Sequence, residues 1–397
     1  MNICLVSQEY PPETAHGGIG SQTYLKAHGL AALGHEVHVI SHSTDFALRT
    51  YQDGAVYVTR VPGFDEQMPI YAEPVRWLTY STNVAVALSE LCTHVSLDLV
   101  DFPEWGGEGY IHLLNQTEWN HIPTVVQLHG PMVMLAHTIG WPDMRSEFYR
   151  VGTMMEGTCL RLADAVYSSS RTSAGWCAKH YGLKCENIPV IHTGVDTHLF
   201  HPHDGPKHDR PTIIFVGRIA PSKGAELLLE AACRLVKNYP DLRLRMLGQG
   251  EESFMKGLHE KAIDSGFPDL LDLPGFTARE DLPYHLSRAH VFAAPSLYEG
   301  GPGFVYLEAM ACGLPVIACE GSGAAEVVIH GKNGFCVPPG DLDQLVKVIR
   351  QLLDHPERLE SMGAQAREYV LTEAESYKCI ARLETFYLDV IAGENHS

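Results

Sequence analysis

The sequence predicts an α/β protein made of two doubly wound domains with parallel sheets that face each other across a cleft. Three observations lead to this prediction. The chain has 397 residues, which is enough for two domains of ordinary size. Short apolar, β-rich runs alternate with longer helical stretches, a pattern typical of βαβ units. The alternation stops once, in the polar stretch 192–211 with its glycines and prolines, and then resumes.

The first half of the chain contains predicted strands that alternate with predicted helices. The strands are Asn2–Ser7, Val37–Ser41, Val56–Val61, Leu97–Phe102, Thr124–Leu128, Ala165–Ser168 and Ile188–His192. The helices are Gly17–Leu33, Val75–Cys92, Arg145–Leu162 and Ser173–Tyr181. Because helices connect the strands, we expect parallel sheets whose carboxyl ends border the cleft, where such folds bind ligands.

The second half repeats the pattern after the linker. We expect strands at Thr212–Val216, Arg243–Leu247, Val291–Ala294 and Pro315–Ala318, and helices at Lys223–Asn238 and around Glu308 in Phe304–Cys312. The chain from about residue 342 to its end is predicted to be helical. Its apolar residues Leu345, Val348, Ile349 and Leu352 share one face at the spacing of a helix.

The composition restricts the class of protein. With 29 basic and 48 acidic residues the net charge is −19, which argues against a nucleic-acid binder, because such a protein needs a basic face. No apolar run approaches the ~18–20 residues of a transmembrane helix, and the first residues are predicted to form a strand and not a signal peptide. Ten cysteines without a CxxC pair indicate reduced thiols. We therefore expect a cytoplasmic protein with at most peripheral membrane contact.

The loop after the first strand, HGGIG at 16–20, is the first candidate for ligand binding. Gly17 and Gly18 would let backbone amides approach an anion at a helix N-terminus. The alternative is a turn that only packs tightly, and the residues alone do not separate the two. No GxGxxG follows this strand, which argues against a nicotinamide-dependent oxidoreductase.

Two cations lie in one strand–helix loop of the second half, VGRIAPSKG at 216–224. Arg218 follows the strand and Lys223 begins the next predicted helix. A guanidinium fork, an ammonium point charge and free helix amides together suit a diphosphate. The alternative is a pair of solvated surface charges. In an acidic chain we favour the diphosphate clamp.

Two carboxylates flank a glycine-rich loop in APSLYEGGPGFVYLEAMACGLPVIA, residues 294–318. Glu299 lies in the loop, and Glu308 lies near the start of the following helix. A single glutamate there usually complements the helix dipole, whereas two of them can each accept hydroxyl hydrogen bonds from a sugar or a ribose. The pair therefore indicates a ligand rich in hydroxyl groups.

Across almost its whole length the sequence resembles the retaining nucleotide-sugar glycosyltransferases of family 4, which have the GT-B fold. The matching segments are GGIG at 17–20, VIHTGVD at 190–196, VGRIAPSKG at 216–224, YEGGPGFVYLEAMACGLPVIA at 298–318 and GKNGFCVPPGD at 331–341. The resemblance implies two Rossmann-like domains. Residues 1–205, with a crossover helix at about 374–397, would form the acceptor-side domain, and residues 206–373 would bind the nucleotide sugar.

The resemblance also implies roles for individual residues. Arg218 and Lys223 would bind the donor diphosphate, Glu299 would bind hydroxyls of the transferred sugar, and Glu308 would bind the ribose. The other implied donor-binding residues are Gly17, Gly18, Gly275, Phe276, Gly303 and Phe304, with the PGFT loop at 274–277 against the nucleobase. Eight residues separate Glu299 from Glu308, where the family usually has seven. The extra residue changes the spacing in the loop that contains Glu299, so it affects which group Glu299 contacts.

His129 is singled out by its position, because it ends the predicted strand TVVQLH and should project into the cleft. As a general base on the acceptor hydroxyl it would make an inverting enzyme. The resemblance instead implies a retaining enzyme in which His129 is a catalytic-site residue that donates a hydrogen bond to the sugar. The strand-end position alone fits both roles.

Two patterns suggest a metal but have plainer explanations. Asp341 and Asp343 form a DxD, yet they follow PPG at the start of a helix, where aspartate is an ordinary cap. The histidines at 198, 201, 203 and 208 lie at irregular spacing in a polar linker, which argues against zinc. We expect no metal and no cofactor, since cationic side chains can stabilise the departing diphosphate.

The sequence thus predicts a hexosyltransferase that uses a nucleotide diphosphate donor, expected to be a UDP-sugar such as UDP-glucose. The acceptor would be a hydroxyl of a glycan or of a lipid-linked molecule, bound near Glu9, 11–20 and 101–110. The resemblance implies a role in polysaccharide biosynthesis. The alternative is a catalytically silent sugar-nucleotide-binding protein of the same fold. The charged residues retained in both loops of the second half argue against that alternative.

Overall fold

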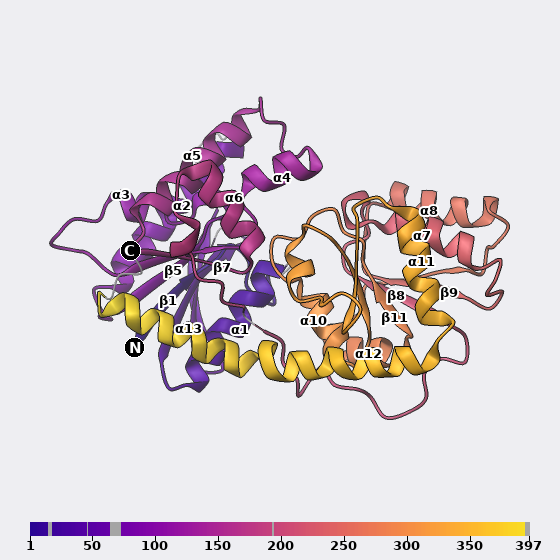
Figure 1. The fold of residues 1–397 in the computed structure, drawn as a ribbon. Helices are drawn as coiled ribbons and strands as arrows, with labels where there is room; N and C mark the ends of the chain where they lie inside the picture. Colours follow the sequence, from indigo (N-terminus) through magenta and orange to yellow (C-terminus); the bar gives the residue numbers. More distant parts are fainter. Residues whose placement is uncertain (15–17, 46, 64–72, 193, 394–397) are drawn as a thin grey trace. The chain divides into compact units, whose positions relative to one another are not determined.

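The computed structural model describes residues 1–14, 18–45, 47–63, 73–192 and 194–393. The chain forms two compact units (Figure 1). Unit 1 contains Met1–Thr193 and Ser376–Ser397, and unit 2 contains Gly194–Glu375. Each unit is an α/β domain with its own sheet, as the alternation of strands and helices predicts.

The sheet of unit 1 has the strand order β3-β4-β2-β1-β5-β6-β7. Its strands are β1 (Asn2–Val6), β2 (Glu36–Ser43), β3 (Arg49–Asp53), β4 (Val56–Pro62), β5 (Leu99–Pro103), β6 (Thr124–Leu128) and β7 (Ala165–Ser168). The pairs are parallel except β3 with β4, which is antiparallel. The carboxyl ends of β5 and β6, which are neighbours, therefore lie at the same edge.

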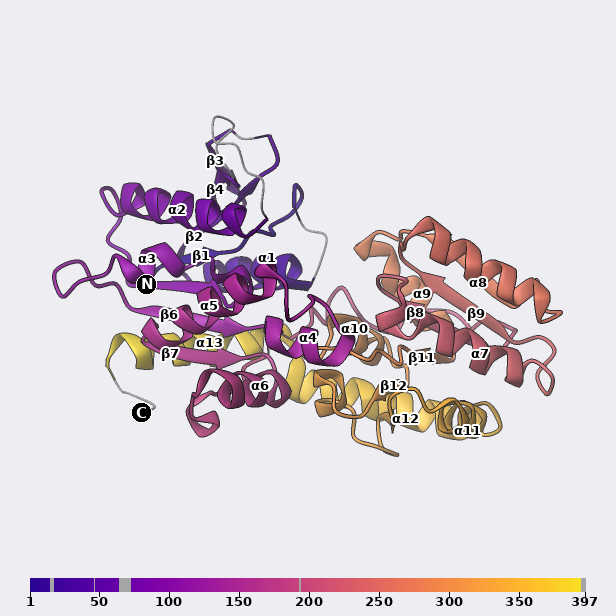
Figure 2. The same cartoon turned by 90° about the horizontal axis from the view of Figure 1, so that it is seen from above.

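Helices cover both faces of this sheet (Figure 2). The longer ones are α1 (Gly18–Ala32), α2 (Glu73–Leu91), α4 (Met132–Ile139), α5 (Glu147–Leu162), α6 (Arg171–Tyr181) and the C-terminal α13 (Ser376–Ile391), with a short α3 (Tyr110–Leu114). One core contains Val84, Leu160 and Cys177 from three of the helices. The C-terminal helix packs on α1, where a Cβ on Gly29 would fall 2.8 Å from the side chain of Ile380.

The sheet of unit 2 has the order β10-β9-β8-β11-β12-β13, and its pairs are parallel. Its strands are β8 (Thr212–Val216), β9 (Arg243–Leu247), β10 (Leu271–Gly275), β11 (Val291–Ala293), β12 (Val316–Cys319) and β13 (Gly334–Val337). Its helices are α7 (Ala225–Leu235), α8 (Glu252–Asp264), α9 (Leu282–Arg288), α10 (Phe304–Ala311), α11 (Leu342–Leu353) and α12 (Pro356–Tyr369). A single apolar core fills this unit.

Several boundaries differ from the predicted ones. The predicted strand Ile188–His192 is wrong, because only Val190 in this run makes a bridge, to Ser168. The helix expected from Lys223 begins at Ala225, since Pro221–Lys223 form a 3₁₀ turn that ends at Gly224 with a φ of +73°.

The compact units divide at Gly194, before the boundary expected at 206. Val195 and Phe200 are buried in the core of unit 2, and the Val195 amide bonds to the Ala374 carbonyl at 2.9 Å. These contacts attach the first part of the polar stretch to unit 2. Every helix in the described part of the chain is too short or too polar to cross a membrane.

Candidate functional site

Two loops at the carboxyl edge of the unit 2 sheet lie against each other. One follows β8 and the other follows β11, which is its neighbour in the sheet. The Leu297 amide donates to the Ser222 carbonyl at 2.9 Å. A Cβ on Gly224 would fall 2.2 Å from the Pro295 carbonyl oxygen, and its φ of +73° also favours glycine. This close backbone approach brings the side chains of the two loops together.

Lys223 and Glu299 form an ion pair between these loops. The ammonium Nζ is 2.7 Å from Glu299 Oε1 and 3.4 Å from the Tyr298 carbonyl oxygen. Both side chains are mostly buried, with exposures of 23% and 16%. A lysine ammonium has three N–H groups, so Lys223 can hold this carboxylate and still donate to a phosphate oxygen. Lys223, predicted for the diphosphate, is thus also the partner of Glu299, predicted for the sugar.

Arg218 lies in the same loop and is exposed. Within the described residues its guanidinium forms no hydrogen bond and no ion pair. The loop backbone around it is tightly packed, because a Cβ on Gly248 would fall 1.9 Å from the Gly217 carbonyl oxygen. A cation free of protein partners at a strand end suits an anionic ligand. The structure does not place Arg218 in contact with Lys223.

Glu308 lies in α10 and is only 2% exposed. Its Oε1 is 2.7 Å from Nη2 of Arg279, although no N–H of that nitrogen points at a hydrogen-bond acceptor. Burial raises the pKa of Glu308, and the charge of Arg279 opposes the rise. Arg279 is not among the site residues predicted from the sequence. The signal for it is its place two residues after the PGFT loop, which was assigned to the nucleobase.

The other predicted donor-binding residues of unit 2 frame this edge. Gly275 ends β10 with a φ of +87°, and Phe276 after it is 73% exposed. Gly303 precedes α10 with a φ of +70°, and a Cβ there would fall 2.7 Å from the Tyr306 ring. Phe304 begins the helix and is half-buried. An exposed aromatic ring beside a strand end can stack on a planar base.

In unit 1 the predicted glycine loop is only partly described. Gly18 is the first residue of α1 and is exposed, with open space around it. Gly17 lies outside the described residues. The amide of Gly20 donates to Glu9 Oε2 at 3.1 Å, so a carboxylate already occupies one N-terminal amide of α1.

His129 was expected to end the strand TVVQLH, and it lies directly after β6, which ends at Leu128; the residue is half-buried. Burial, with a smaller contribution from the charge of Lys26, lowers the pKa of His129 to about 3. The imidazole is therefore neutral at pH 7, with one nitrogen that donates and one that accepts. Its ring makes no hydrogen bond to the described residues. Its backbone amide donates to both carboxylate oxygens of Glu104 at 2.8 Å.

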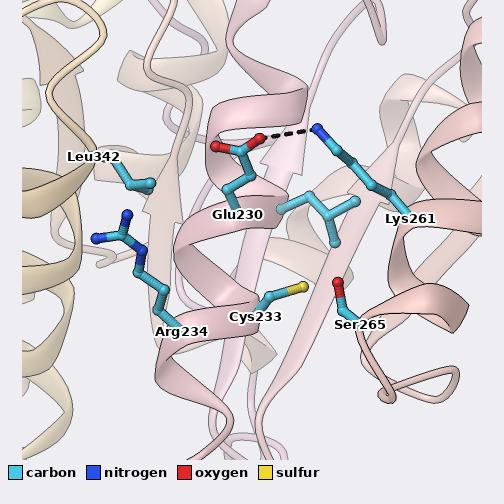
Figure 3. Close-up of a pocket in the computed structure, with 7 residues that line it drawn as sticks. Glu230, Cys233, Arg234, Lys261, Ser265 and Leu342 are labelled. Atoms are coloured by element: carbon cyan, nitrogen blue, oxygen red, sulfur yellow. Dashed lines mark hydrogen bonds and ion pairs between the residues drawn. The ribbon is translucent and has the colours of Figure 1, made fainter.

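The two aspartates of the DxD pattern make contacts within the fold. Asp341 caps α11 by accepting the Gln344 amide at 2.9 Å, as expected, and Asp343 pairs with Arg234 at 2.5 Å. Arg234 also lines a pocket of about 250 Å³, in which Lys261 Nζ donates to Glu230 Oε1 at 2.9 Å. Figure 3 shows the residues that line this pocket. This pocket lies toward the C-terminal end of α7, whereas Lys223 precedes its N-terminal end. No cluster of three potential metal ligands occurs among the described residues.

Comparisons with known proteins agree with this geometry. A family model described as Glycosyltransferase Family 4 matches residues 16–199, and one described as Glycosyl transferases group 1 matches residues 197–369. A GDP-mannose-dependent alpha-(1-6)-phosphatidylinositol monomannoside mannosyltransferase of Mycolicibacterium smegmatis is 31% identical over 287 residues, which is 64% of this chain and 72% of that protein. The chain belongs to glycosyltransferase family 4. This confirms the resemblance and the predicted enzyme class.

Two further proteins are similar to this family 4 glycosyltransferase over nearly its whole length. The MMP alpha-(1->4)-mannosyltransferase of Mycolicibacterium hassiacum is 28% identical over 419 residues, 96% of each chain. The structure of a sucrose-phosphate synthase from Thermosynechococcus elongatus superposes with a TM-score of 0.83 at 22% identity, covering 98% of this chain and 99% of that one. The structural likeness confirms the GT-B fold.

Proposed function

We propose that this glycosyltransferase transfers a hexose from a nucleoside diphosphate donor to a hydroxyl of a glycan or lipid-linked acceptor, with retention of configuration and without a metal. The observation that carries the proposal is the arrangement at the carboxyl edge of the unit 2 sheet. There Lys223 pairs with Glu299, and Glu308 pairs with Arg279. These groups offer cations for a diphosphate and carboxylates for sugar and ribose hydroxyls.

The chemical task of these cations is to stabilise the charge that grows on the departing diphosphate. Fixed donors aimed at developing charge are usually the strongest contribution to such catalysis. Lys223 is held by Glu299 at 2.7 Å, so its position does not need to be reorganised when the bond breaks. Arg218, exposed in the same loop, supplies the second charge. With two cations in place, the reaction needs no metal.

The pKa of His129 supports a positioning role. A general base works best when its pKa lies near the working pH, and a histidine with a pKa of about 3 is a weak base. As a neutral ring it can donate a hydrogen bond to a sugar hydroxyl. A product with the donor's anomeric configuration, assigned by NMR of its anomeric proton, would support this role. An inverted product would contradict both retention and the residue roles.

The donor that we propose to test first is GDP-mannose. The expected UDP-sugar, such as UDP-glucose, differs from the donor named for the mannosyltransferase of Mycolicibacterium smegmatis that is 31% identical, which is GDP-mannose-dependent. The base and the sugar are set by contacts around Phe276 and Glu299, in which the two donor classes would differ. Polysaccharide biosynthesis and a cytoplasmic location stay predictions.

The deciding experiment incubates the purified protein with GDP-mannose, UDP-glucose and other nucleotide sugars. A donor that binds the folded state raises the melting temperature, and turnover releases its nucleotide. We expect both effects with one donor class. Stabilisation by a donor without nucleotide release, in the presence of a broad set of acceptors, would favour the catalytically silent alternative.

A further inference from the structure

The short connection between β6 and α4 carries His129, and buried carboxyl groups bind its backbone. Residues 129–132 have three backbone N–H groups, because residue 131 is proline. The amide of His129 donates to Glu104 Oε1 and Oε2 at 2.8 Å, and the amide of Gly130 donates to Oε1 at 2.5 Å. The amide of Met132 donates to Glu156 at 3.2 and 3.3 Å. Every N–H of this turn is thus bound by a carboxyl group.

This arrangement is costly for the fold. Glu104, directly after β5, and Glu156, in α5, are both 0% exposed. A buried carboxylate loses its hydration, whereas a backbone carbonyl or a water could satisfy the same amides at lower cost. Carboxylate acceptors make stronger hydrogen bonds than neutral ones and fix the donors more firmly. The cost therefore indicates that the position of this turn matters.

We propose that Glu104 is the positioning residue of His129, and that its ionised carboxylate fixes the turn in the geometry needed for transfer. Glu104 touches the backbone of His129 and not its ring, so its effect passes through the orientation of the imidazole. The inference rests on the proposed role of His129 in holding the transferred sugar. Protonation of Glu104 would weaken the bonds to His129 and Gly130, and the turn would then sample other positions.

The surroundings of Glu104 place its ionisation near neutral pH. Burial raises the pKa of Glu104 to about 7, and the amides of Gly130 and His129 limit the rise. The groups that face it are Glu108 in its own loop, Glu156 in α5 and the thiol of Cys177 in α6. Burial and the charge of Glu104 raise the pKa of Glu156 well above its ordinary value. Burial and the neighbouring Glu104 thus both disfavour the charged form of Glu156.

The pKa values of the neighbouring His129 and Glu108 differ from that of Glu104. The pKa of His129 is lowered to about 3, and the ammonium of Lys26 contributes to that shift. The pKa of Glu108 is raised to about 8, chiefly by burial and further by the charges of Glu9 and Glu104. The pKa of Glu104, about 7, thus lies far above that of His129 and below that of Glu108, and of these three side chains only Glu104 binds the amides of His129 and Gly130.

The test compares Glu104→Gln with Glu156→Gln, two isosteric changes at the same turn. In the wild type, kcat should fall on the acid side with an apparent pKa of about 7. Glu104→Gln should lower kcat at pH 8 by about 10–100-fold and remove this acid limb, with an unchanged nucleotide Kd. Glu156→Gln should keep the acid limb, because Glu156 accepts from the Met132 amide and not from the amides of His129 and Gly130. An unchanged acid limb in Glu104→Gln would overturn the proposal.

A second measurement does not depend on catalysis. The backbone amide resonances of His129 and Gly130 are followed by NMR from pH 5.5 to 8.5 in the wild type. We expect both to shift with a midpoint near pH 7 and to stay constant in Glu104→Gln. Wild-type amides that do not titrate would overturn the inference, even if the variants failed to fold. Absence of transfer with every nucleotide sugar would contradict the proposed function alone, and the NMR titration would still decide the role of Glu104.

Discussion

The two units treat carboxylates at their strand ends in opposite ways. In unit 2, Glu299 and Glu308 each lie 2.7 Å from a cationic nitrogen, of Lys223 and of Arg279. In unit 1, three glutamates after β5 and in α5 are buried and raised in pKa, and none forms an ion pair with a described residue: Glu104, Glu108 and Glu156. The cations at the edge of the unit 2 sheet can bind an anion, whereas the charge of the buried carboxyl groups of unit 1 changes with pH. The first should respond to charge removal and the second to pH.

The largest effect is expected from Lys223→Ala in unit 2. Losing one strong stabiliser of developing charge should lower turnover by about 10²–10³-fold. Steady-state rates with saturating donor measure this, with Lys237→Ala, an exposed lysine after α7, as the matched control. If the double variant Arg218→Ala/Lys223→Ala keeps both turnover and nucleotide affinity, the diphosphate is bound elsewhere.

Glu308→Gln should have the next largest effect. The amide keeps the shape of the side chain but weakens a charge-assisted hydrogen bond by about 1–2 kcal/mol. Both the free nucleotide and the intact donor should therefore bind about 5–30-fold more weakly, which calorimetry can measure. An unchanged nucleotide Kd would refute the assignment of Glu308 to the ribose. Exposed Glu252→Gln in α8 serves as the control.

A smaller effect distinguishes unit 1 by the pH dependence of its stability. The pKa of Glu108 is about 8 in the folded state against an ordinary 4.5. The folded state therefore binds more protons between these values, and the free energy of unfolding falls as pH rises through this range. His129, with a folded pKa of about 3 and an ordinary one of about 6.5, also makes stability depend on pH, but it does so equally in wild type and variant and cancels in their difference.

The measurement is the melting temperature of Glu108→Gln and of wild type between pH 6.5 and 8. As pH rises, the melting temperature of the variant should increase relative to that of the wild type. The expected increase is about 2–4 °C for each kcal/mol by which the free energy of unfolding of the wild type falls. A difference that is constant with pH would show that Glu108 ionises normally. Exposed Glu90→Gln in α2 should give such a constant difference and is the control.

The smallest expected effect is that of chelation. Because Arg218 and Lys223 carry the positive charge, EDTA should leave turnover within about twofold of its untreated value. The assay compares EDTA-treated enzyme with and without added Mg²⁺. Loss of activity that Mg²⁺ restores would require a metal and would return attention to Asp341 and Asp343.

Local sequence was enough to predict the loops of the site. A strand, a glycine-containing loop and a helix are contiguous, so the order of residues alone placed Arg218, Lys223, Glu299 and His129 at strand ends. Local sequence was not enough to predict a strand where pairing with a neighbouring strand decides whether the segment joins the sheet. The run Ile188–His192 is apolar but does not join the sheet as a strand, whereas the polar segment β3 (Arg49–Asp53) is a strand because β4 pairs with it.

The sequence by itself thus determined two α/β domains, the family and the positions of the charged residues along the chain. Only the tertiary structure decided which charges meet. Lys223 and Glu299 are 76 residues apart, and Glu104 reaches the His129 amide from 25 residues away. Pairing and desolvation depend on which elements pack together, and they decide whether a glutamate lies beside a cation, as in unit 2, or is buried without one, as Glu104 is in unit 1.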